Sequence, residues 1–308
     1  MEAKRPDITI VSAGLCGFDD LTATALRHLQ QAHTIYYSGF NGNPNQQLLS
    51  PSAEIINLDE GRYVYGAYRP QIYEDMASVI VERARASPGL VVLQPGSAML
   101  IDTVTKHVLR KAQQHNLGVN LICGVSSIES VLCQLRHCVL DALQVFLAQA
   151  MILKRMPIQR SIDTIIMQPG YYDTLWWSGL SVSKSGRFDG LFEYIGRFVR
   201  PADEAALVIS PCIACPKGLV FWFEFGDIRE ICDRISPFHT LFIPRSEELS
   251  DDPQFADRIR SWAIHQASMT RDAGQGETER IWFNHDCTQL PERLRARSLE
   301  IGRRRGAS

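Results

Sequence analysis

Short runs of apolar, mostly β-branched residues recur through the first half of the chain, and each run stops at glycine, proline or polar residues. Runs of about four to eight such residues are typical of buried strands. Segments with apolar residues at helical spacing lie between them, at about 70–85 and 99–115. Strands that alternate with helices predict a parallel sheet. The expected strands are Ile8–Val11, Thr34–Tyr37, Ala53–Leu58, Leu90–Leu93 and Val119–Ile122.

The second half of the chain has longer and more aromatic apolar runs. Its run Leu219–Phe223 is typical of a mixed or antiparallel sheet that packs on one side. Strands are expected over 163–168, 205–210, 218–225 and 240–244, and helices over 188–198 and 228–235. We therefore predict an α/β fold with a parallel-sheet subdomain (1–122), a mixed-sheet subdomain (123–245) and a helical C-terminal extension (246–308). Clefts between such halves often bind small molecules, so we expect a ligand cleft there.

Composition narrows the class of protein. The 308 residues are 45% hydrophobic and 21% charged, as in an ordinary globular protein. A formal net charge of −2 gives no electrostatic case for binding nucleic acid or an anionic membrane. The sequence opens without a signal-peptide pattern, and it has no apolar run long enough to span a bilayer. We therefore expect a cytoplasmic protein that binds neither nucleic acid nor membranes.

The eight cysteines are widely spread, and Cys212-Ile213-Ala214-Cys215 is the one CxxC motif. Redox activity or metal binding is conceivable there, but no second pair stands at zinc-site spacing. The motif lies in an apolar segment that resembles a strand, so we favour buried, reduced thiols. We expect no metal site.

A polar and aromatic segment, Tyr63 to Met76, is the strongest candidate for chemistry. Arg69 and Tyr73 are four residues apart, so they share one face of the predicted helix. A guanidinium within reach of the phenols of Tyr63 and Tyr73 would stabilise a phenolate and lower a tyrosine pKa, which suits proton abstraction. The alternative is that the tyrosines cover the surface and the arginine is a solvated charge. The spacing alone leaves both interpretations open.

Two turns follow predicted parallel strands, at the edge where open α/β sheets bind ligands. They are Gln94-Pro95-Gly96 and Gly124-Val125-Ser126-Ser127. Serines in such a turn often only cap the next helix. The first strand is not followed by a GxGxxG motif, so a dinucleotide site is not indicated.

These turns, together with the opening Ile10–Gly14 and Asp20-Leu21-Thr22, resemble the tetrapyrrole-methylase superfamily, whose enzymes use S-adenosylmethionine (SAM). The sequence is most similar to one branch, the borosin-type peptide backbone α-N-methyltransferases. In that branch a tyrosine, an arginine and a second tyrosine precede a methionine-containing helix, as Tyr63, Arg69, Tyr73 and Met76 do here. The similarity covers about residues 7 to 245.

The resemblance implies roles for these residues. Tyr73 is expected to be the base, Arg69 to hold the phenolate or the developing oxyanion, and Tyr63 to donate a hydrogen bond to the amide oxygen. SAM is expected in the cleft between the halves, leaving as S-adenosylhomocysteine, and relatives form homodimers to which the apolar helix around Phe255 to Ile264 could contribute. The expected cofactor-binding residues are Gln94, Pro95, Gly96, Met99, Leu100, Ser126, Ser127, Phe146, Leu147, Ala148, Met167, Gln168, Thr240 and Leu241.

The sequence also departs from that branch. Gln94 stands where the branch has a histidine, and Cys123 replaces the proline before Gly124. Residues 246–308 contain no repetitive apolar core peptide, so a peptide substrate is expected in trans. Two other functions stay open: a SAM-dependent methyltransferase of a small natural product or a tetrapyrrole, and a non-catalytic SAM-fold binding or scaffold protein.

Overall fold

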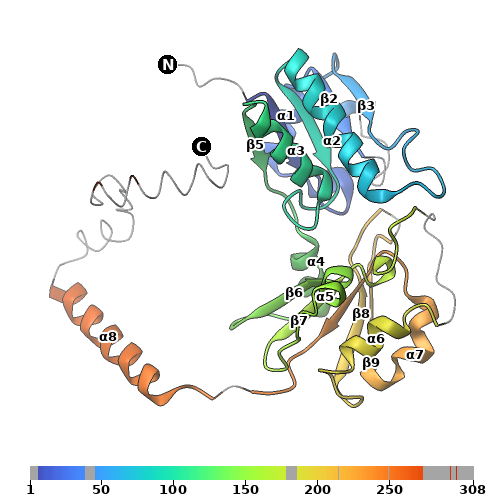
Figure 1. Ribbon diagram of the computed structural model, residues 1–308. Coiled ribbons are helices and arrows are strands. Elements are labelled where there is room, and N and C mark those ends of the chain that lie inside the picture. Colours follow the sequence, from blue (N-terminus) through green and yellow to red (C-terminus); the bar gives the residue numbers. More distant parts are fainter. Residues whose placement is uncertain are drawn as a thin grey trace. The chain divides into compact units, whose positions relative to one another are not determined.

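The computed structural model describes residues 6–38, 46–177, 186–213, 215–248, 250–272, 292 and 296. The chain divides into two compact units, Met1–Glu247 and Glu248–Ser308. The first unit contains two five-stranded sheets (Figure 1). The boundary predicted between two subdomains at residue 122 falls inside this unit and stays a prediction.

The N-terminal sheet is entirely parallel, as predicted, with the strand order β3-β2-β4-β1-β5. Its central strands β1, β2 and β4 are buried along their whole length, which explains their continuous apolar sequences. The strands are β1 (Ile8–Ser12), β2 (Thr34–Tyr37), β3 (Glu54–Asn57), β4 (Leu90–Gln94) and β5 (Val119–Ile122).

Helices cover both faces of this sheet, and alternate residues along each strand contact different helices. Ile10 and Val92 pack in one core cluster with α2 (Arg69–Ala86) and α3 (Thr103–Gln114), which lie side by side in Figure 1. Val11 and Val91 pack in another with α1 (Ala23–Gln30).

The helix predicted over 99–115 begins four residues later than expected. Asp102 is its N-cap, because its carboxylate accepts a hydrogen bond from the Thr105 N–H at 2.6 Å. Ile101 has a φ of +56°, a left-handed conformation that a helix cannot include. Met99, Leu100 and Ile101 therefore belong to the loop between β4 and α3.

The second sheet is mixed, again as predicted, with the order β6-β7-β10-β8-β9. Strands β6 and β7 are parallel, and the other neighbours are antiparallel. The strands are β6 (Leu143–Leu147), β7 (Asp163–Met167), β8 (Glu204–Ile209), β9 (Leu219–Glu224) and β10 (His239–Ile243). The helices are α4 (Ser127–Leu135), α5 (Ala148–Leu153), α6 (Asp189–Ile195) and α7 (Ile228–Ile231), with 3-10 turns at Gly17–Asp20, Gln46–Leu48, Pro169–Tyr171, Phe225–Asp227 and Cys232–Arg234.

The two faces of this sheet also differ. One packs against α5, α6 and α7, and includes Ile166 and Leu241. The other packs against α4, and includes Ile165 and Met167. Leu100 from the β4–α3 loop joins this second cluster, so a segment that follows the parallel sheet contacts the mixed one.

The second unit contains α8 (Pro253–Asp272), the helix predicted in the C-terminal extension. Phe255, Ile259 and Trp262 are exposed and fall on one helix face by their spacing. Most of the predicted extension (246–308) from residue 273 onward, including the tail predicted from Pro291 on, lies outside the described residues. Among the residues that are described, no helix is long and apolar enough to cross a membrane.

The CxxC motif does not lie in a strand. Cys212 and Cys215 exchange backbone hydrogen bonds of 3.1 and 3.0 Å in the turn that joins the antiparallel strands β8 and β9. Both side chains are partly exposed, and Cys123, Cys133 and Cys138 are exposed. The prediction of buried thiols is therefore wrong for this motif, because the chain must reverse there. No group of three metal-ligand side chains occurs among the described residues.

Candidate functional site

The predicted Arg69–Tyr73 pair forms at the start of α2. Arg69 is the first helical residue and Pro70 stands in the first turn, where a missing N–H costs no helical hydrogen bond. One turn later, the Tyr73 phenol oxygen accepts a hydrogen bond from Arg69 Nε at 3.0 Å. The expectation that these two side chains share one helix face is confirmed.

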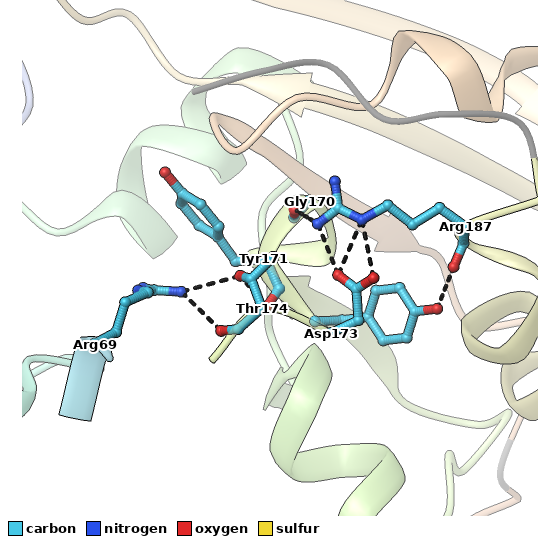
Figure 2. A network of polar contacts seen from close by, with 7 residues as sticks. Arg69, Gly170, Tyr171, Asp173, Thr174 and Arg187 are labelled. Carbon is cyan, nitrogen blue, oxygen red and sulfur yellow. Dashed lines mark hydrogen bonds and ion pairs between the residues drawn. The ribbon is translucent and has the colours of Figure 1, made fainter. Parts of the chain in front are cut away.

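A segment distant in sequence holds the other side of Arg69. Its Nη1 donates to the carbonyl oxygen of Thr174 at 3.3 Å and to the Thr174 Oγ1 at 3.2 Å (Figure 2). The guanidinium carbon lies 4.5 Å from the centroid of the Tyr171 ring, within cation–π distance. The Thr174 hydroxyl in turn donates to the Tyr171 carbonyl at 3.2 Å. Arg69 is thus held along one edge and on one face.

The remaining nitrogen of Arg69 is available for a ligand. Within the described part of the chain, Nη2 makes no hydrogen bond and Arg69 has no carboxylate partner. In a planar guanidinium, one N–H of Nη2 points to the same side as the Nε–H. The Nε–H is directed at Tyr73, so an oxygen atom bound at Nη2 would lie beside the Tyr73 hydroxyl.

Tyr63 completes the group from the loop before α2. Its ring lies 4.9 Å from the Trp177 ring, and its phenol shares a hydrogen bond with that of Tyr73. Burial strongly raises the pKa of Tyr63, the nearby Tyr73 and Asp59 raise it further, and Arg69 opposes them only in part. Loss of hydration thus outweighs the guanidinium at Tyr63, so the lowered tyrosine pKa expected beside Arg69 is not found at this phenol. At neutral pH Tyr63 is a hydrogen-bond donor.

Backbone pairing fixes the two segments to each other. The Gly66 N–H donates to the Trp177 carbonyl at 2.8 Å, and the Trp177 N–H donates to the Ala67 carbonyl at 2.7 Å. The Arg69 N–H donates to the Leu175 carbonyl at 2.9 Å. This second segment was not predicted from the sequence. Its signal was the density of aromatic residues after the strand ending at Pro169-Gly170, which include Tyr171, Tyr172, Trp176 and Trp177.

Three loops meet at the carboxyl edge of the parallel sheet, where the first predicted cofactor residues lie. Gly14 and Gly96 exchange backbone hydrogen bonds of 3.1 and 2.8 Å. The Ser12 hydroxyl accepts a hydrogen bond from the Ala98 N–H at 3.0 Å. A Cβ added at Gly124 would lie only 2.5 Å from the Ser12 carbonyl oxygen, so the backbones approach closely there.

Another group of predicted cofactor residues gathers in the mixed sheet. Leu147 is paired with Met167, and Met167 with Thr240. Phe146 and Leu241 occupy the adjacent row, on either side of Ile166. Ala148 follows as the first residue of α5, and Gln168, with a φ of +53°, turns the chain after β7.

The two groups meet through Leu100, which packs against the cluster containing Met167. The other predicted cofactor residues have different surroundings. Gln94 is buried at the end of β4, and Met99 is exposed. Ser126 is the N-cap of α4, since its hydroxyl accepts a hydrogen bond from the Ile128 N–H at 3.2 Å, and Ser127 is the first residue of that helix. The predicted cofactor residues thus lie on loops and strand ends of the first unit that meet through Leu100.

Comparisons with known proteins agree with this fold. The family of tetrapyrrole (corrin/porphyrin) methylases matches residues 7–154. Uroporphyrin-III C-methyltransferase from Thermus thermophilus is similar in structure, with a TM-score of 0.57 and 16% identity over 78% of this chain and 94% of that one. The cobalt-precorrin-4 methyltransferase CbiF gives 0.54 and 13%, over 77% and 94%. The methyltransferase CobJ gives 0.56 and 11%, over 80% and 97%. No curated protein matched the sequence.

At these identities the solved structures establish the fold, and the family match adds the chemistry that its members share. The borosin branch is not distinguished by either comparison. The family model matches residues 7–154 and the two-sheet fold is shared over most of the chain, so the protein is a SAM-dependent methyltransferase whose fold is similar to that of the tetrapyrrole methylases.

Proposed function

We propose that the protein methylates backbone amide nitrogens of a ribosomally made peptide supplied in trans. The observation that carries this proposal is the open Nη2 of Arg69 on the guanidinium edge that also holds Tyr73. N-methylation of an amide needs a base and a hydrogen-bond donor to the developing oxyanion, and these two groups lie side by side here.

An amide N–H is too weakly acidic to lose its proton readily in water at neutral pH. Its removal needs a positioned base and a donor for the negative charge that develops on the amide oxygen. In the proposed reaction Tyr73 acts as a phenolate and takes the N–H proton, becoming a neutral phenol. Arg69 Nη2 donates a hydrogen bond to the amide oxygen, and the single O–H of Tyr63 turns from the Tyr73 oxygen to donate to the amide oxygen as well. SAM supplies the methyl group that the nitrogen accepts and leaves as S-adenosylhomocysteine.

The residues at the sheet edges fit SAM. At Gly96, an added Cβ would meet only the Leu15 Cδ2, at 3.8 Å, so a ligand can approach the backbone there. Leu100 and Met167, which share one apolar cluster, suit the adenine ring. We propose that the other predicted cofactor residues also contact SAM, because they lie on the same loops and strand ends.

The surroundings of Arg69 favour an uncharged acceptor. Tetrapyrroles carry several carboxylates, each of which needs a cationic or polar partner. Near Arg69, the neighbouring Arg187 is already paired with Asp173, and Arg62 donates to the Leu58 carbonyl at 2.8 Å. In the described part of the chain the Arg69 guanidinium has no carboxylate partner and lies against the Tyr73 and Tyr171 rings, which matches a single amide oxygen better than a polyanion.

Two measurements test the proposal in sequence. Isothermal titration with SAM and S-adenosylhomocysteine should show binding of both, and incubation with SAM and a library of synthetic peptides should add a methyl group at backbone nitrogens, located by tandem mass spectrometry. Tyr73→Phe should lower the methylation rate by about 10²-fold or more while leaving SAM affinity nearly unchanged, because the hydroxyl serves the chemistry. Arg69→Ala should be at least as damaging.

Other results would replace the proposal. Methylation of uroporphyrinogen III with no reaction on any peptide would favour a tetrapyrrole substrate. SAM binding without methylation of any acceptor would favour the scaffold interpretation. A wild-type rate in Tyr73→Phe would remove the assignment of the base. The homodimer implied by the resemblance is a separate prediction, and a monomeric mass by light scattering would contradict it.

A further inference from the structure

The Arg187–Asp173 ion pair lies beside the candidate site and outside the predicted motifs. Arg187 Nε donates to the two carboxylate oxygens of Asp173 at 3.0 and 2.9 Å, and Arg187 Nη2 donates to Asp173 Oδ1 at 2.7 Å. The same Nη2 donates to the Gly170 carbonyl at 2.9 Å. The Tyr172 hydroxyl donates to the Arg187 carbonyl. A single arginine therefore contacts three residues of the segment Gly170–Thr174.

This segment is the one that holds Arg69. Asp173 is adjacent to Thr174, whose carbonyl and hydroxyl accept from Arg69, and it is two residues from Tyr171, on which the guanidinium stacks. At the other end of the segment Gly170 is packed tightly, since an added Cβ would lie 2.5 Å from the Ser236 carbonyl oxygen. The segment is thus fixed at Gly170 by packing and at Asp173 by a charge-assisted fork.

We propose that Asp173 and Arg187 are positioning residues that fix Tyr171 and Thr174, and through them the orientation of the Arg69 guanidinium. Their catalytic meaning rests on the proposed function, because the orientation matters only if Nη2 must lie beside Tyr73. Their effect on the geometry of Arg69 does not depend on the identity of the substrate.

The alternative is an ordinary surface ion pair. The Arg187 and Asp173 side chains are 22% and 36% exposed, and such pairs contribute little to stability. The two interpretations differ in what they predict for Arg69. A surface pair can be broken without any change at Arg69, whereas loss of a positioning pair frees Arg69 to lose its Thr174 and Tyr73 contacts.

The first test observes Arg69 directly and needs no substrate. The ¹⁵N–¹H signal of Arg69 Nε, identified by its absence in Arg69→Lys, should exchange slowly with water in the wild-type protein. In Asp173→Asn, which keeps the side-chain shape and removes the charge, its exchange should accelerate about tenfold. Glu193→Gln, which breaks the exposed Arg197–Glu193 pair at 3.3 Å, is the matched control and should leave the signal unchanged.

The second test uses methyl transfer from SAM to a synthetic peptide that the wild-type protein methylates. Asp173→Asn should lower kcat about tenfold or more with little change in peptide KM, since a misplaced group costs rate. Arg187→Lys keeps the charge but cannot form the fork, and it should behave similarly. Thr174→Ser keeps the hydroxyl and should retain the wild-type kcat. Thr174→Val removes the hydroxyl and should lower kcat.

The two tests separate the failure of this inference from that of the proposed function. If no peptide is methylated by the wild-type protein, the proposed function fails and the exchange measurement still decides the positioning role. If Asp173→Asn unfolds the protein, Arg187→Lys and Thr174→Val are judged by the same exchange signal. An unchanged Arg69 signal in folded variants of both Asp173 and Arg187 would overturn the inference.

Discussion

Tyr63 and Tyr73 share a hydrogen bond, but Tyr73 is the proposed base and Tyr63 a proposed hydrogen-bond donor. The burial of Tyr63 can be tested without a substrate. Burial raises the pKa of Tyr63 above the ordinary tyrosine value of about 10. Above about pH 10 the unfolded chain therefore releases this proton while the folded protein retains it. Stability to unfolding should then fall as pH rises, with Tyr63 contributing about 1.4 kcal/mol per pH unit, and Tyr63→Phe should remove that contribution.

Urea unfolding at several alkaline pH values measures this slope. Tyr65→Phe is the matched control two residues away, because the Tyr65 side chain is 86% exposed, and it should leave the slope in place. In the methylation assay Tyr63→Phe should also lower the rate at neutral pH, since a donor to the amide oxygen is lost. If the stability of Tyr63→Phe fell with alkaline pH as steeply as that of the wild-type protein, Tyr63 would not be buried as described.

At this scale the sequence predicts local pairs and misses distant ones. Arg69 and Tyr73 lie one helical turn apart, so their contact follows from spacing alone. Thr174 reaches Arg69 across 105 residues, and nothing in the local pattern indicates that pairing. The raised pKa of Tyr63 could not be inferred from the sequence, because a nearby charge is visible there, whereas burial depends on the folded chain.

At the scale of elements, the turn after β5 depends on the absence of a side chain at Gly124. An added Cβ would lie 2.5 Å from the Ser12 carbonyl oxygen and 2.9 Å from the Ser12 Cβ. Neither neighbour can move freely, since Ser12 is buried and holds the Ala98 N–H. Gly124→Ala should therefore destabilise the fold by about 1–3 kcal/mol, as overpacking does, and weaken SAM binding by shifting the β4–α3 loop.

Gly118, at the other end of β5, is the matched control. Its added Cβ would come no closer than 3.6 Å to any neighbour, so Gly118→Ala should change stability by less than about 1 kcal/mol. Chemical denaturation and SAM titration of both variants measure the difference. Equal stability and SAM affinity in the two variants would contradict the close approach of β1 and the β5–α4 turn.

Elements with a regular apolar pattern were predictable, and their ends were less so. The strands of the parallel sheet could be recognised as continuous apolar runs, because helices cover both faces of the sheet and bury every side chain of β1 and β4. The start of α3 was predicted too early, since Met99 and Leu100 continue the apolar pattern while the Asp102 cap decides where the helix begins. The CxxC turn was read as part of a strand because its residues are apolar, but the reversal between β8 and β9 requires antiparallel pairing that local sequence does not specify.

At the scale of the whole molecule, the division into Met1–Glu247 and Glu248–Ser308 separates the candidate site from α8. Arg160 ties down the end of the first unit, because its carbonyl accepts from the Ser246 N–H at 2.9 Å and its Nη1 lies 2.7 Å from the Glu247 carboxylate. A chain ending at Glu247 should therefore fold, melt within about 4 °C of the full chain and bind SAM with similar affinity.

A chain ending at Pro244 is the informative comparison. It also loses the Arg245 N–H that donates to the Asp163 carboxylate at 2.9 Å, together with the Ser246 and Glu247 contacts. Asp163 is a buried residue of β7, and loss of a partner for a buried carboxylate costs about 1–3 kcal/mol. This chain should thus melt several degrees below the one ending at Glu247. If the Glu247 chain instead loses SAM binding while remaining folded, the second unit contributes to the cofactor site, and the site as built from the first unit is incomplete.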